Sequence, residues 1–437
     1  MDASAHFRDK KITVMRIGLL GRGVGDTAFL AECGANILVV DDAPQEVMQP
    51  SIDALKEFKN VRFKFGKYDL DDFRNCDLVL KGAGTPLDSP EIAEAHARGI
   101  PVRMSADLFA EISGTTCIGV TGTRGKSTVV HMLAAIFKEA GKKVLLGGNV
   151  RGVSTLTLLN TVTPEHLAVL ELDSWQLQGW GEAKMSPHIA VFATFYPDHL
   201  NYYHNDLDAY LADKANIFLY QKPEDTLILG KQCAATIIEK YGNKIGAKTQ
   251  VVDELKLPDA WTLQVPGIHN RYNAALALTA ARVAGVPDEA SRRALAAFRG
   301  VLGRLELIAE KKGIKIYNDT TATTPEATLA ALSALGTENT IVIAGGTDKG
   351  LELNTLIAGL KGAKRLILLA GSGTERIQGE FPDAPVYDAL ALAIEDAISH
   401  AKKGDTVLFS PAFTSFGMFK NEFDRGDQFV ALVKGRL

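Results

Sequence analysis

The sequence predicts an α/β protein whose parallel sheets are covered by helices on both faces. Short apolar runs, each followed by a glycine turn and then a helical pattern, occur at 14–20, 116–120 and 340–344. Continuous apolar strands that alternate with helices are typical of parallel sheets buried on both sides. The theme restarts three times in 437 residues, and a domain takes roughly 150 residues. We therefore expect three domains.

Short polar or glycine-containing segments mark the boundaries between these domains. A polar stretch at 111–116 precedes the second glycine turn, and a glycine-containing segment at 298–304 precedes a strand expected at 314–317. These breaks predict domains at 1–112, 113–300 and 301–437.

Composition excludes several classes of protein. Apolar residues make up 46% and charged residues 23% of the chain, which excludes wholesale disorder. The net charge of −4 gives no general attraction to nucleic acid or to an anionic membrane. No apolar run reaches the ~18 residues that span a bilayer, and the four cysteines form no CxxC pair. We expect a soluble, cytoplasmic monomer without disulfides or a thiolate zinc site.

The strongest local signal is the segment 119–128, GVTGTRGKST, with a helix expected at 129–140. Gly122 and Gly125 allow the backbone N–H groups to point at phosphate oxygens, and the helix N-terminus adds a positive dipole end. Lys126 would reach the β- and γ-phosphates, as in a P-loop.

Only the C-terminal part of the P-loop pattern is met, because Val120 stands where the first glycine is usual. Ser127 or Thr128 would hold Mg²⁺. The alternative is a lysine at an ordinary turn between a strand and a helix.

An earlier glycine turn, 17–26, reads IGLLGRGVGD and is followed by a strand at 36–40 that ends in Asp41 and Asp42. This order is similar to the opening of a dinucleotide-binding fold, with an acid for a ribose or base edge. Asp26 stands where the fingerprint needs its third glycine, so the evidence for NAD is weak. Binding of some nucleotide and a purely structural turn both stay open.

Several segments spread over the whole chain resemble the Mur ligase family. They are 121–128 (TGTNGKST in the family), 147–149 (GGN), 171–176 (ELSSFQ), 198–199 (DH), 269–273 (HNxxN), 304–306 (R-[FM]-E) and 318–323 (NDSKATN). The segment 410–426 resembles the C-terminal signature of the branch that adds D-glutamate. The order and spacing of these segments argue against chance.

The resemblance implies a three-domain fold: a Rossmann-like N-terminal domain, a central P-loop mononucleotide-binding ATPase domain and a C-terminal Rossmann-like α/β domain. It implies an ADP-forming amide ligase that adds D-glutamate to UDP-N-acetylmuramoyl-L-alanine, in the synthesis of bacterial peptidoglycan precursors. ATP would phosphorylate the substrate carboxylate, and the amine would attack the acyl phosphate. Phosphoryl transfer needs mainly positioning and charge neutralisation from a protein.

The resemblance also assigns residues to roles. The catalytic residues would be Lys126, His199 and Lys214. ATP would contact Gly122, Thr123, Arg124, Gly125, Lys126, Ser127, Thr128, Asn270, Asn273, Arg304 and Asp319. The other substrates would contact Val24, Gly25, Asp41, Asp42, Asn149, Lys349, Ser415 and Phe419. One Mg²⁺ would lie on Ser127 or Thr128 and Glu171, and a second on His199 and a carbamylated Lys214.

Two of these assignments have plain alternatives. Lys214 could be an exposed helix lysine in a surface ion pair, whereas a carbamate would turn it into the anionic oxygen ligand that Mg²⁺ prefers. Asn270 could cap a helix rather than read the adenine edge.

Three positions depart from the family pattern and put the added amino acid in doubt. Thr321 replaces a lysine, Asp173 replaces a serine, and Glu422 stands where an aromatic residue is frequent. A related ligase that adds L-glutamate or another amino acid is therefore the alternative.

Two other classes compete less well. A non-catalytic nucleotide-binding regulator would not need Glu171, His199 and Lys214 together. An NAD-dependent dehydrogenase predicts an intact GxGxxG and no lysine loop, and the sequence has the reverse.

Overall fold

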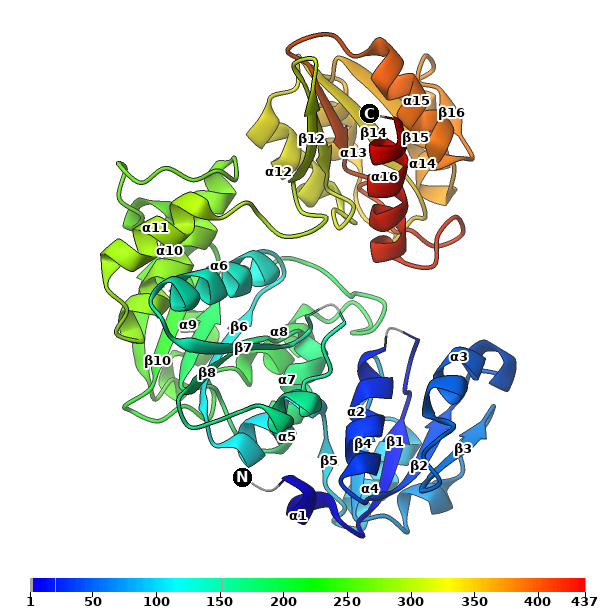
Figure 1. Ribbon diagram of the computed structural model, residues 1–437, viewed down its shortest axis with the longest axis vertical. Helices are drawn as coiled ribbons and strands as arrows, with labels where there is room; N and C mark the ends of the chain where they lie inside the picture. The colour runs from blue at the N-terminus through cyan, green and yellow to red at the C-terminus, as the bar shows by residue number, and fades with distance from the viewer. Residues whose placement is uncertain (1–2, 20, 151, 437) are drawn as a thin grey trace. The chain divides into compact units, whose positions relative to one another are not determined.

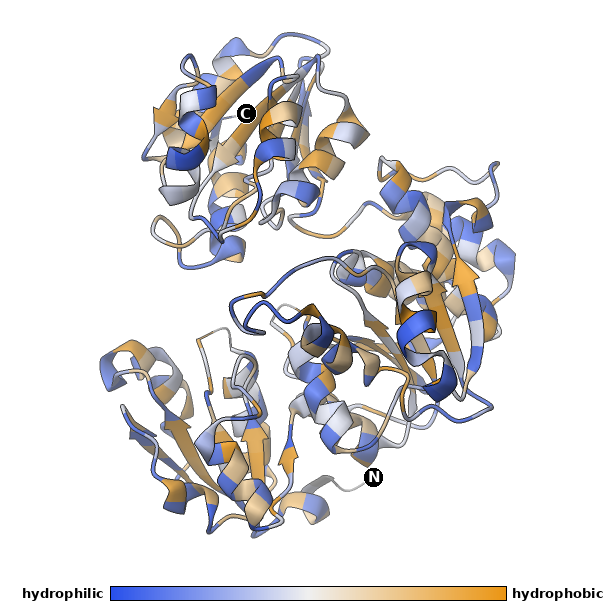
Figure 2. Cartoon of the chain, turned by 180° about the vertical axis from the view of Figure 1, so that it is seen from behind, coloured by the Kyte–Doolittle hydropathy of each residue, from blue (hydrophilic) through white to orange (hydrophobic). Residues whose placement is uncertain are grey.

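The computed structural model describes residues 3–19, 21–150 and 152–436 (Figure 1). The chain forms two compact units: Met1–Asp259 with Tyr272–Leu295, and Ala260–Arg271 with Ala296–Leu437. Two sheets lie in the first unit and one in the second. Helices cover the sheets, and Figure 2 shows hydrophobic residues concentrated on the strands and hydrophilic residues on loops and outer helix faces. The α/β fold class is confirmed.

The first sheet has five parallel strands in the order β3-β2-β1-β4-β5. The strands are β1 (Lys11–Met15), β2 (Asn36–Asp41), β3 (Val61–Phe65), β4 (Leu78–Lys81) and β5 (Val102–Arg103). The helices are α1 (Ala3–Phe7), α2 (Arg22–Glu32), α3 (Gln45–Leu55), α4 (Pro90–Ala97) and α5 (Ser105–Ser113), with a 3₁₀ turn at Leu70–Phe73.

The first strand begins and ends earlier than the predicted 14–20. Arg16 and Gly18 have φ values of 60° and 68°, and left-handed backbone does not continue a strand. Leu20 lies outside the described residues.

The second sheet has six parallel strands in the order β11-β10-β9-β6-β8-β7. The strands are β6 (Thr116–Thr121), β7 (Lys143–Gly148), β8 (His166–Glu171), β9 (Ile189–Phe192), β10 (Thr226–Gly230) and β11 (Lys248–Val252). The helices are α6 (Lys126–Glu139), α7 (Ser174–Glu182), α8 (Leu207–Ala215), α9 (Lys231–Tyr241), α10 (Ile268–Val283) and α11 (Asp288–Ala297). Short 3₁₀ turns are η2 (Leu156–Asn160), η3 (Gly242–Lys244) and η4 (Glu254–Lys256).

The third sheet has the order β12-β13-β17-β14-β15-β16, and only its β12–β13 pair is antiparallel. The strands are β12 (Glu306–Lys311), β13 (Ile314–Asn318), β14 (Thr340–Gly345), β15 (Arg365–Leu369), β16 (Val386–Tyr387) and β17 (Thr406–Phe409). The helices are α12 (Pro325–Leu335), α13 (Asn354–Leu360), α14 (Ser372–Ile377), α15 (Leu390–His400) and α16 (Glu422–Arg436), with a 3₁₀ turn at Gln378–Glu380.

The predicted domain boundaries at 112 and 300 stay predictions. The strands of the three sheets span 11–103, 116–252 and 306–409. No helix in the described parts of the chain has the length and apolarity needed to cross a membrane.

Candidate functional site

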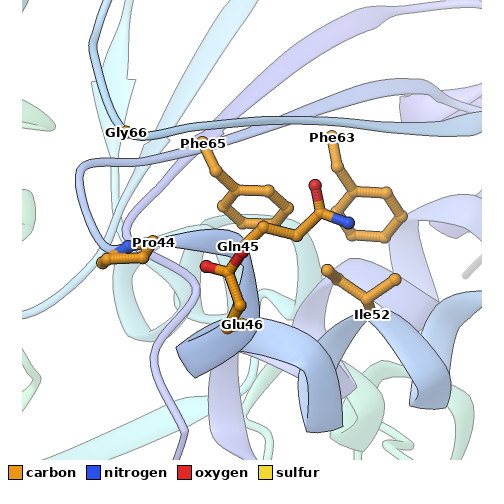
Figure 3. Close-up of a pocket in the computed structure, with 7 residues that line it drawn as sticks. All are labelled: Pro44, Gln45, Glu46, Ile52, Phe63, Phe65 and Gly66. Atoms are coloured by element: carbon orange, nitrogen blue, oxygen red, sulfur yellow. The ribbon is translucent and has the colours of Figure 1, made fainter.

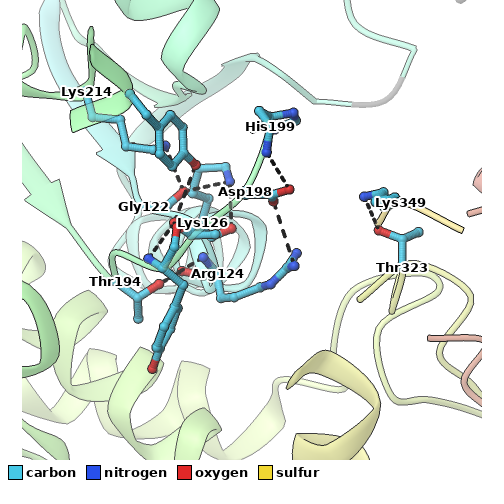
Figure 4. Close-up of polar contacts among 12 residues, drawn as sticks. Gly122, Arg124, Lys126, Thr194, Asp198, His199, Lys214, Thr323 and Lys349 are labelled. Carbon is cyan, nitrogen blue, oxygen red and sulfur yellow. Dashed lines mark hydrogen bonds and ion pairs between the residues drawn. The ribbon is translucent and has the colours of Figure 1, made fainter. Parts of the chain in front are cut away.

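The lysine loop joins the carboxyl end of β6 to the start of α6 (Figure 4). Gly122 and Gly125 have φ values of 140° and 89°, which favour glycine. A Cβ on Gly122 would lie 2.8 Å from the backbone N of Thr194, and one on Gly125 would lie 2.6 Å from Asn273 Oδ1. Both glycines are therefore required by conformation and by close neighbours.

Two hydrogen bonds donated by backbone N–H groups of this loop fix its conformation. Thr123 N donates to the Thr194 carbonyl at 2.8 Å, and Arg124 N donates to Thr194 Oγ1 at 2.9 Å. Thr194 follows β9, so the strand next to β6 holds the loop in shape. Fixed backbone of this kind suits recognition of an anion by the loop and by the helix N-terminus.

Lys126 extends back along the loop from the first position of α6. Its Nζ donates to the carbonyls of Gly122 and Thr123 at 2.8 and 3.3 Å. The ammonium thus lies within the loop itself (Figure 4), where it can neutralise charge on an anion that the loop binds.

Glu171 ends β8, one of the two strands beside β6, and His199 lies in the segment that follows the other, β9. In the sheet register Val120 pairs with Glu171, and Thr121 pairs with Phe192, the last residue of β9. Glu171 is buried at the end of β8, with 4% of its surface exposed. The carboxyl ends of parallel strands meet at one edge of the sheet, where ligands bind in such folds.

His199 is half-buried, and its backbone is left-handed, with a φ of 55°. Its ring centroid lies 4.6 Å from that of Trp175. Its backbone N donates to Asp198 Oδ1 at 2.9 Å, and Asp198 Oδ2 lies 3.8 Å from Arg124 Nη2. Burial lowers the pKa of His199, which favours the neutral imidazole that can bind a metal.

Lys214 lies on α8 with 1% of its surface exposed. Its Nζ donates to the Gly122 carbonyl at 3.1 Å and lies 4.8 Å from the Tyr210 ring centroid. The alternative of an exposed surface lysine is therefore wrong. Burial, and then the charge of Lys126, hold the pKa of Lys214 well below its ordinary value.

The expected Mg²⁺ site can be compared with the side chains that are available as ligands near the loop. Among the described residues, no three His, Cys, Asp or Glu side chains gather as a ready metal site. Mg²⁺ is usually held by one or two carboxylates, water and substrate phosphates. Glu171 and Ser127, both buried beside the loop, fit that smaller requirement.

The predicted residues of the first sheet lie at the start of α2 and at the end of β2. Val24 and Gly25 lie in the first turn of α2. Asp41, which ends β2, accepts a hydrogen bond from Ala43 N at 3.0 Å, and Asp42 forms an ion pair with Arg16 at 2.6 Å.

Two cavities lie near these residues. One, of about 300 Å³, is lined by residues that include Gln45, Phe63 and Phe65 (Figure 3). The rings of Phe63 and Phe65 stack with their centroids 5.9 Å apart. The other, of about 230 Å³, lies among the ends of β1 and β4, the start of α2 and residues that follow β7.

Three cations line the 230 Å³ cavity, and the sequence analysis missed them: Arg16, Arg22 and Lys81. Lys81 is only 3% exposed, and its Nζ donates to the Thr85 carbonyl at 2.8 Å. Burial lowers the pKa of Lys81 to about 8. The sequence feature that could have pointed to Lys81 is its position, since it ends an apolar strand and precedes a glycine-containing turn. Arg22 Nη1 donates to Oδ1 of Asn149, a predicted substrate residue.

The remaining predicted residues belong to the second unit. They are Asn270, Arg304, Asp319, Lys349, Ser415 and Phe419. Asp319 is buried: its Oδ1 accepts from Leu305 N at 3.0 Å and its Oδ2 from Ser410 Oγ at 2.7 Å. Burial raises the pKa of Asp319 to about 7. Lys349 Nζ lies 3.4 Å from Thr323 Oγ1. Within the first unit, the structure brings Lys126, Glu171, His199, Lys214 and Asn273 to one sheet edge.

The three departures from the family pattern have local roles. Asp173 caps α7 by accepting from Gln176 N at 2.8 Å. Thr321 donates from Oγ1 to the Gly303 carbonyl at 2.9 Å. Glu422 begins α16, and its carbonyl accepts from Thr320 Oγ1 at 2.9 Å. None of the three breaks the fold locally.

A lysine loop at the edge of a parallel sheet, with an acid at the end of one adjoining strand and a histidine in the segment after the other, defines a P-loop α/β protein. The model of the Mur ligase middle domain matches residues 120–281, and that of the Mur ligase glutamate ligase domain matches residues 303–413. The chain belongs to the Mur ligase family.

Similar proteins cover nearly the whole chain. UDP-N-acetylmuramoylalanine--D-glutamate ligase of Roseiflexus sp. is 34% identical, over 97% of this chain and 98% of that protein. The ligase of the same name from Streptococcus mutans is 33% identical, over 98% of each chain. The MurF ligase of Thermotoga maritima, solved in complex with ADP, has a TM-score of 0.60 at 18% identity and covers 100% of this chain and 98% of its own; this likeness supports the fold alone.

Proposed function

We propose that this protein is an ATP-dependent ligase that joins D-glutamate to UDP-N-acetylmuramoyl-L-alanine in peptidoglycan precursor synthesis. The observation that carries the proposal is its identity of 31–34% to D-glutamate ligases over 96% or more of both chains. The lysine loop and its buried neighbours support the chemistry.

The reaction begins with a poor electrophile, the alanine carboxylate of the precursor. A carboxylate oxygen attacks the γ-phosphorus of ATP, the bond to the β,γ-bridging oxygen breaks, and ADP leaves. The product is an acyl phosphate. The neutral amine of D-glutamate then attacks the acyl carbon, and the tetrahedral intermediate expels phosphate to leave an amide.

The first step asks the protein for positioning and charge neutralisation. The backbone amides of residues 122–128 would hold the phosphates, with Lys126 Nζ against the γ-phosphoryl oxygens. Asn273, whose Oδ1 lies against Gly125, would support the nucleotide side of the loop. Arg304 and Asp319 are proposed to meet ATP from the second unit.

Mg²⁺ would be held by Ser127 or Thr128 and Glu171, and a second ion by His199 and a carbamylated Lys214. These ions would neutralise charge that develops on the phosphoryl oxygens. Lys214 supports this assignment because its buried, weakly basic amine is well suited to combine with CO₂.

The precursor would bind to the first sheet and the glycine turn. The cations that line the 230 Å³ cavity, Arg16, Arg22 and Lys81, suit the diphosphate of a nucleotide-linked sugar. Asn149 lies on Arg22 and would also contact the precursor. Lys349, Ser415 and Phe419 are proposed to receive the dianionic glutamate.

The test is a phosphate-release assay with UDP-N-acetylmuramoyl-L-alanine, ATP and a panel of D- and L-amino acids. We expect release with D-glutamate at a kcat/KM at least about a hundredfold above that of any other amino acid, since a polar site rejects a misplaced charged group strongly. Preference for L-glutamate would replace this proposal with the alternative ligase. No release with any amino acid would overturn it.

A further inference from the structure

One face of helix α2 docks on the chain that follows β7. Positions 22, 25 and 26 of α2 are neighbours on a helix surface. Arg22 Nη1 donates to Asn149 Oδ1, and a Cβ on Gly25 would lie 2.7 Å from the Cβ of Ser154. The helix therefore approaches this segment as closely as a glycine allows.

Asp26 lies at the centre of this contact. It is 5% exposed, and its Oδ1 accepts from Ser154 Oγ at 2.7 Å and from the backbone N of Leu156 at 3.2 Å. Leu156 is the first residue of the turn η2, so the carboxylate binds an otherwise unpaired helical N–H. A buried carboxylate is costly unless it is hydrogen-bonded, and burial raises the pKa of Asp26.

The same contact forms two walls of one cavity. The 230 Å³ cavity is lined by Arg22, Gly23 and Asp26 from the glycine turn and by Gly148 and Val153 from the segment after β7. Any slip of α2 along that segment would change the distance between these walls. Asp26 also stands where a dinucleotide fingerprint has its third glycine, a position that normally only lets the helix pack closely. Here its side chain instead connects α2 of the first sheet with the segment that follows β7 of the second.

We infer that Asp26 and Ser154 are positioning residues that hold α2 against residues 152–156, so that Arg22 and Asn149 face the precursor with a fixed spacing. The inference rests on the proposed function for the identity of the precursor. Neither residue needs to touch the reacting atoms.

The test compares Asp26→Ala, Ser154→Ala and the double variant in the full-length chain. Each single change is expected to raise the KM for UDP-N-acetylmuramoyl-L-alanine about tenfold, as befits a lost charge-assisted hydrogen bond, with the KM for ATP changed less than about twofold. The double variant should be no worse than the poorer single one, because both changes remove the same link. Asp26→Asn keeps the Oδ1 acceptor and is expected to restore the precursor KM.

Asn60→Ala is the matched structural control. Asn60 Nδ2 donates to the carbonyls of Ala31 and Ala35 at 2.9 and 2.8 Å, at the opposite end of α2. This change should lower the melting temperature without raising the precursor KM. Equal changes in both KM values, additive effects, or the same KM change in Asn60→Ala would overturn the inference.

Hydrogen exchange at the Leu156 amide tests the link without any substrate. Asp26→Ala should speed exchange there about tenfold or more, and unchanged exchange overturns the inference whatever the substrate is. If the wild-type chain does not turn over this precursor, the proposed function is overturned. Faster exchange at Leu156 in Asp26→Ala would still support the role of Asp26 in holding α2 against residues 152–156.

Discussion

Lys214 shows how burial and a like charge together change the chemistry of a side chain. Its Nζ lies near a carbonyl, a hydroxyl and an aromatic ring, and the like charge of Lys126 also acts on it. Both the burial and the like charge disfavour protonation. The free amine is the form that can attack CO₂, and the resulting carbamate would place an anion beside the lysine loop.

Carbamylation of Lys214 would make ligase activity depend on CO₂, most strongly at low pH. As the pH falls, the amine of Lys214 becomes protonated and the carbamate is lost, so ligase activity in CO₂-depleted buffer should fall. Added bicarbonate should restore it, measured as phosphate release from pH 6 to pH 8.5.

Two variants make the same prediction sharper. Lys214→Arg keeps a cation that cannot lose its proton, so it should lose activity on the order of a hundredfold and gain nothing from bicarbonate. Lys231→Ala removes an exposed lysine of α9 and should keep the wild-type response. Full activity in Lys214→Arg would remove the carbamate from the mechanism.

The lysine-loop residues could be predicted from the sequence because the residues that form the motif lie close together along the chain. Gly122, Gly125 and Lys126 lie within one turn of chain, and the structure places them at the junction of β6 and α6. Lys81 and Arg22 were not found in the same way. Their significance comes from a cavity whose walls lie far apart in the sequence, so the local signal at Lys81, a lysine at the end of an apolar strand, could not show what that lysine faces.

At the scale of elements, helix α7 shows why Asp173 can replace serine. Asp173 has extended backbone, with φ −78° and ψ 179°, and its side chain accepts from Gln176 N. Serine and aspartate are about equally good at this N-cap position. The substitution therefore changes charge near Glu171 but keeps the start of the helix.

The cap predicts how substitutions at this position will affect stability. Asp173→Ala should lower the free energy of unfolding by about 1 kcal/mol, measured by denaturant unfolding, whereas Asp173→Ser should stay close to the wild type. Asp206→Ala removes the N-cap of α8, which accepts from Asp208 N and Ala209 N, and provides a matched reference loss. If Asp173→Ser were as unstable as Asp173→Ala, charge rather than capping would be the role of this side chain.

Element boundaries followed from the sequence where side chains determine them. The strand predicted at 116–120 is β6, Thr116–Thr121, and the strand predicted at 340–344 is β14, Thr340–Gly345. Strand β9 ends at Phe192 although the mostly apolar run continues to Phe195, because the chain beyond Phe192 turns to hold the lysine loop through Thr194. Apolar character continued past the end of that strand, so hydrophobic pattern alone could not show the end.

At the scale of the whole molecule, each of the two compact units has hydrophobic clusters of its own among the described residues. One cluster of the first unit joins residues as distant as Phe7 and Ile237. The clusters on the two faces of the third sheet are drawn from residues between 305 and 433. The sequence predicted three α/β repeats but could not predict that the first two sheets share a core, because such sharing depends on contacts between sheets.

Separate cores predict that the chain unfolds in more than one step, with the lysine loop coupled to only one of them. ATP bound to the loop should stabilise the first unit by about 2.7 kcal/mol at a hundredfold excess over its Kd, and so raise the calorimetric transition of that unit more than the transition of the other. Lys126→Ala should abolish this shift without changing the transitions of the free protein, whereas Lys138→Ala, an exposed lysine on the same helix, should retain it. A single transition that moves as a whole, or a shift that survives in Lys126→Ala, would contradict either the independence of the units or the role of the loop. The first outcome bears on the cores and the second on Lys126, so one scan in each variant separates the two claims.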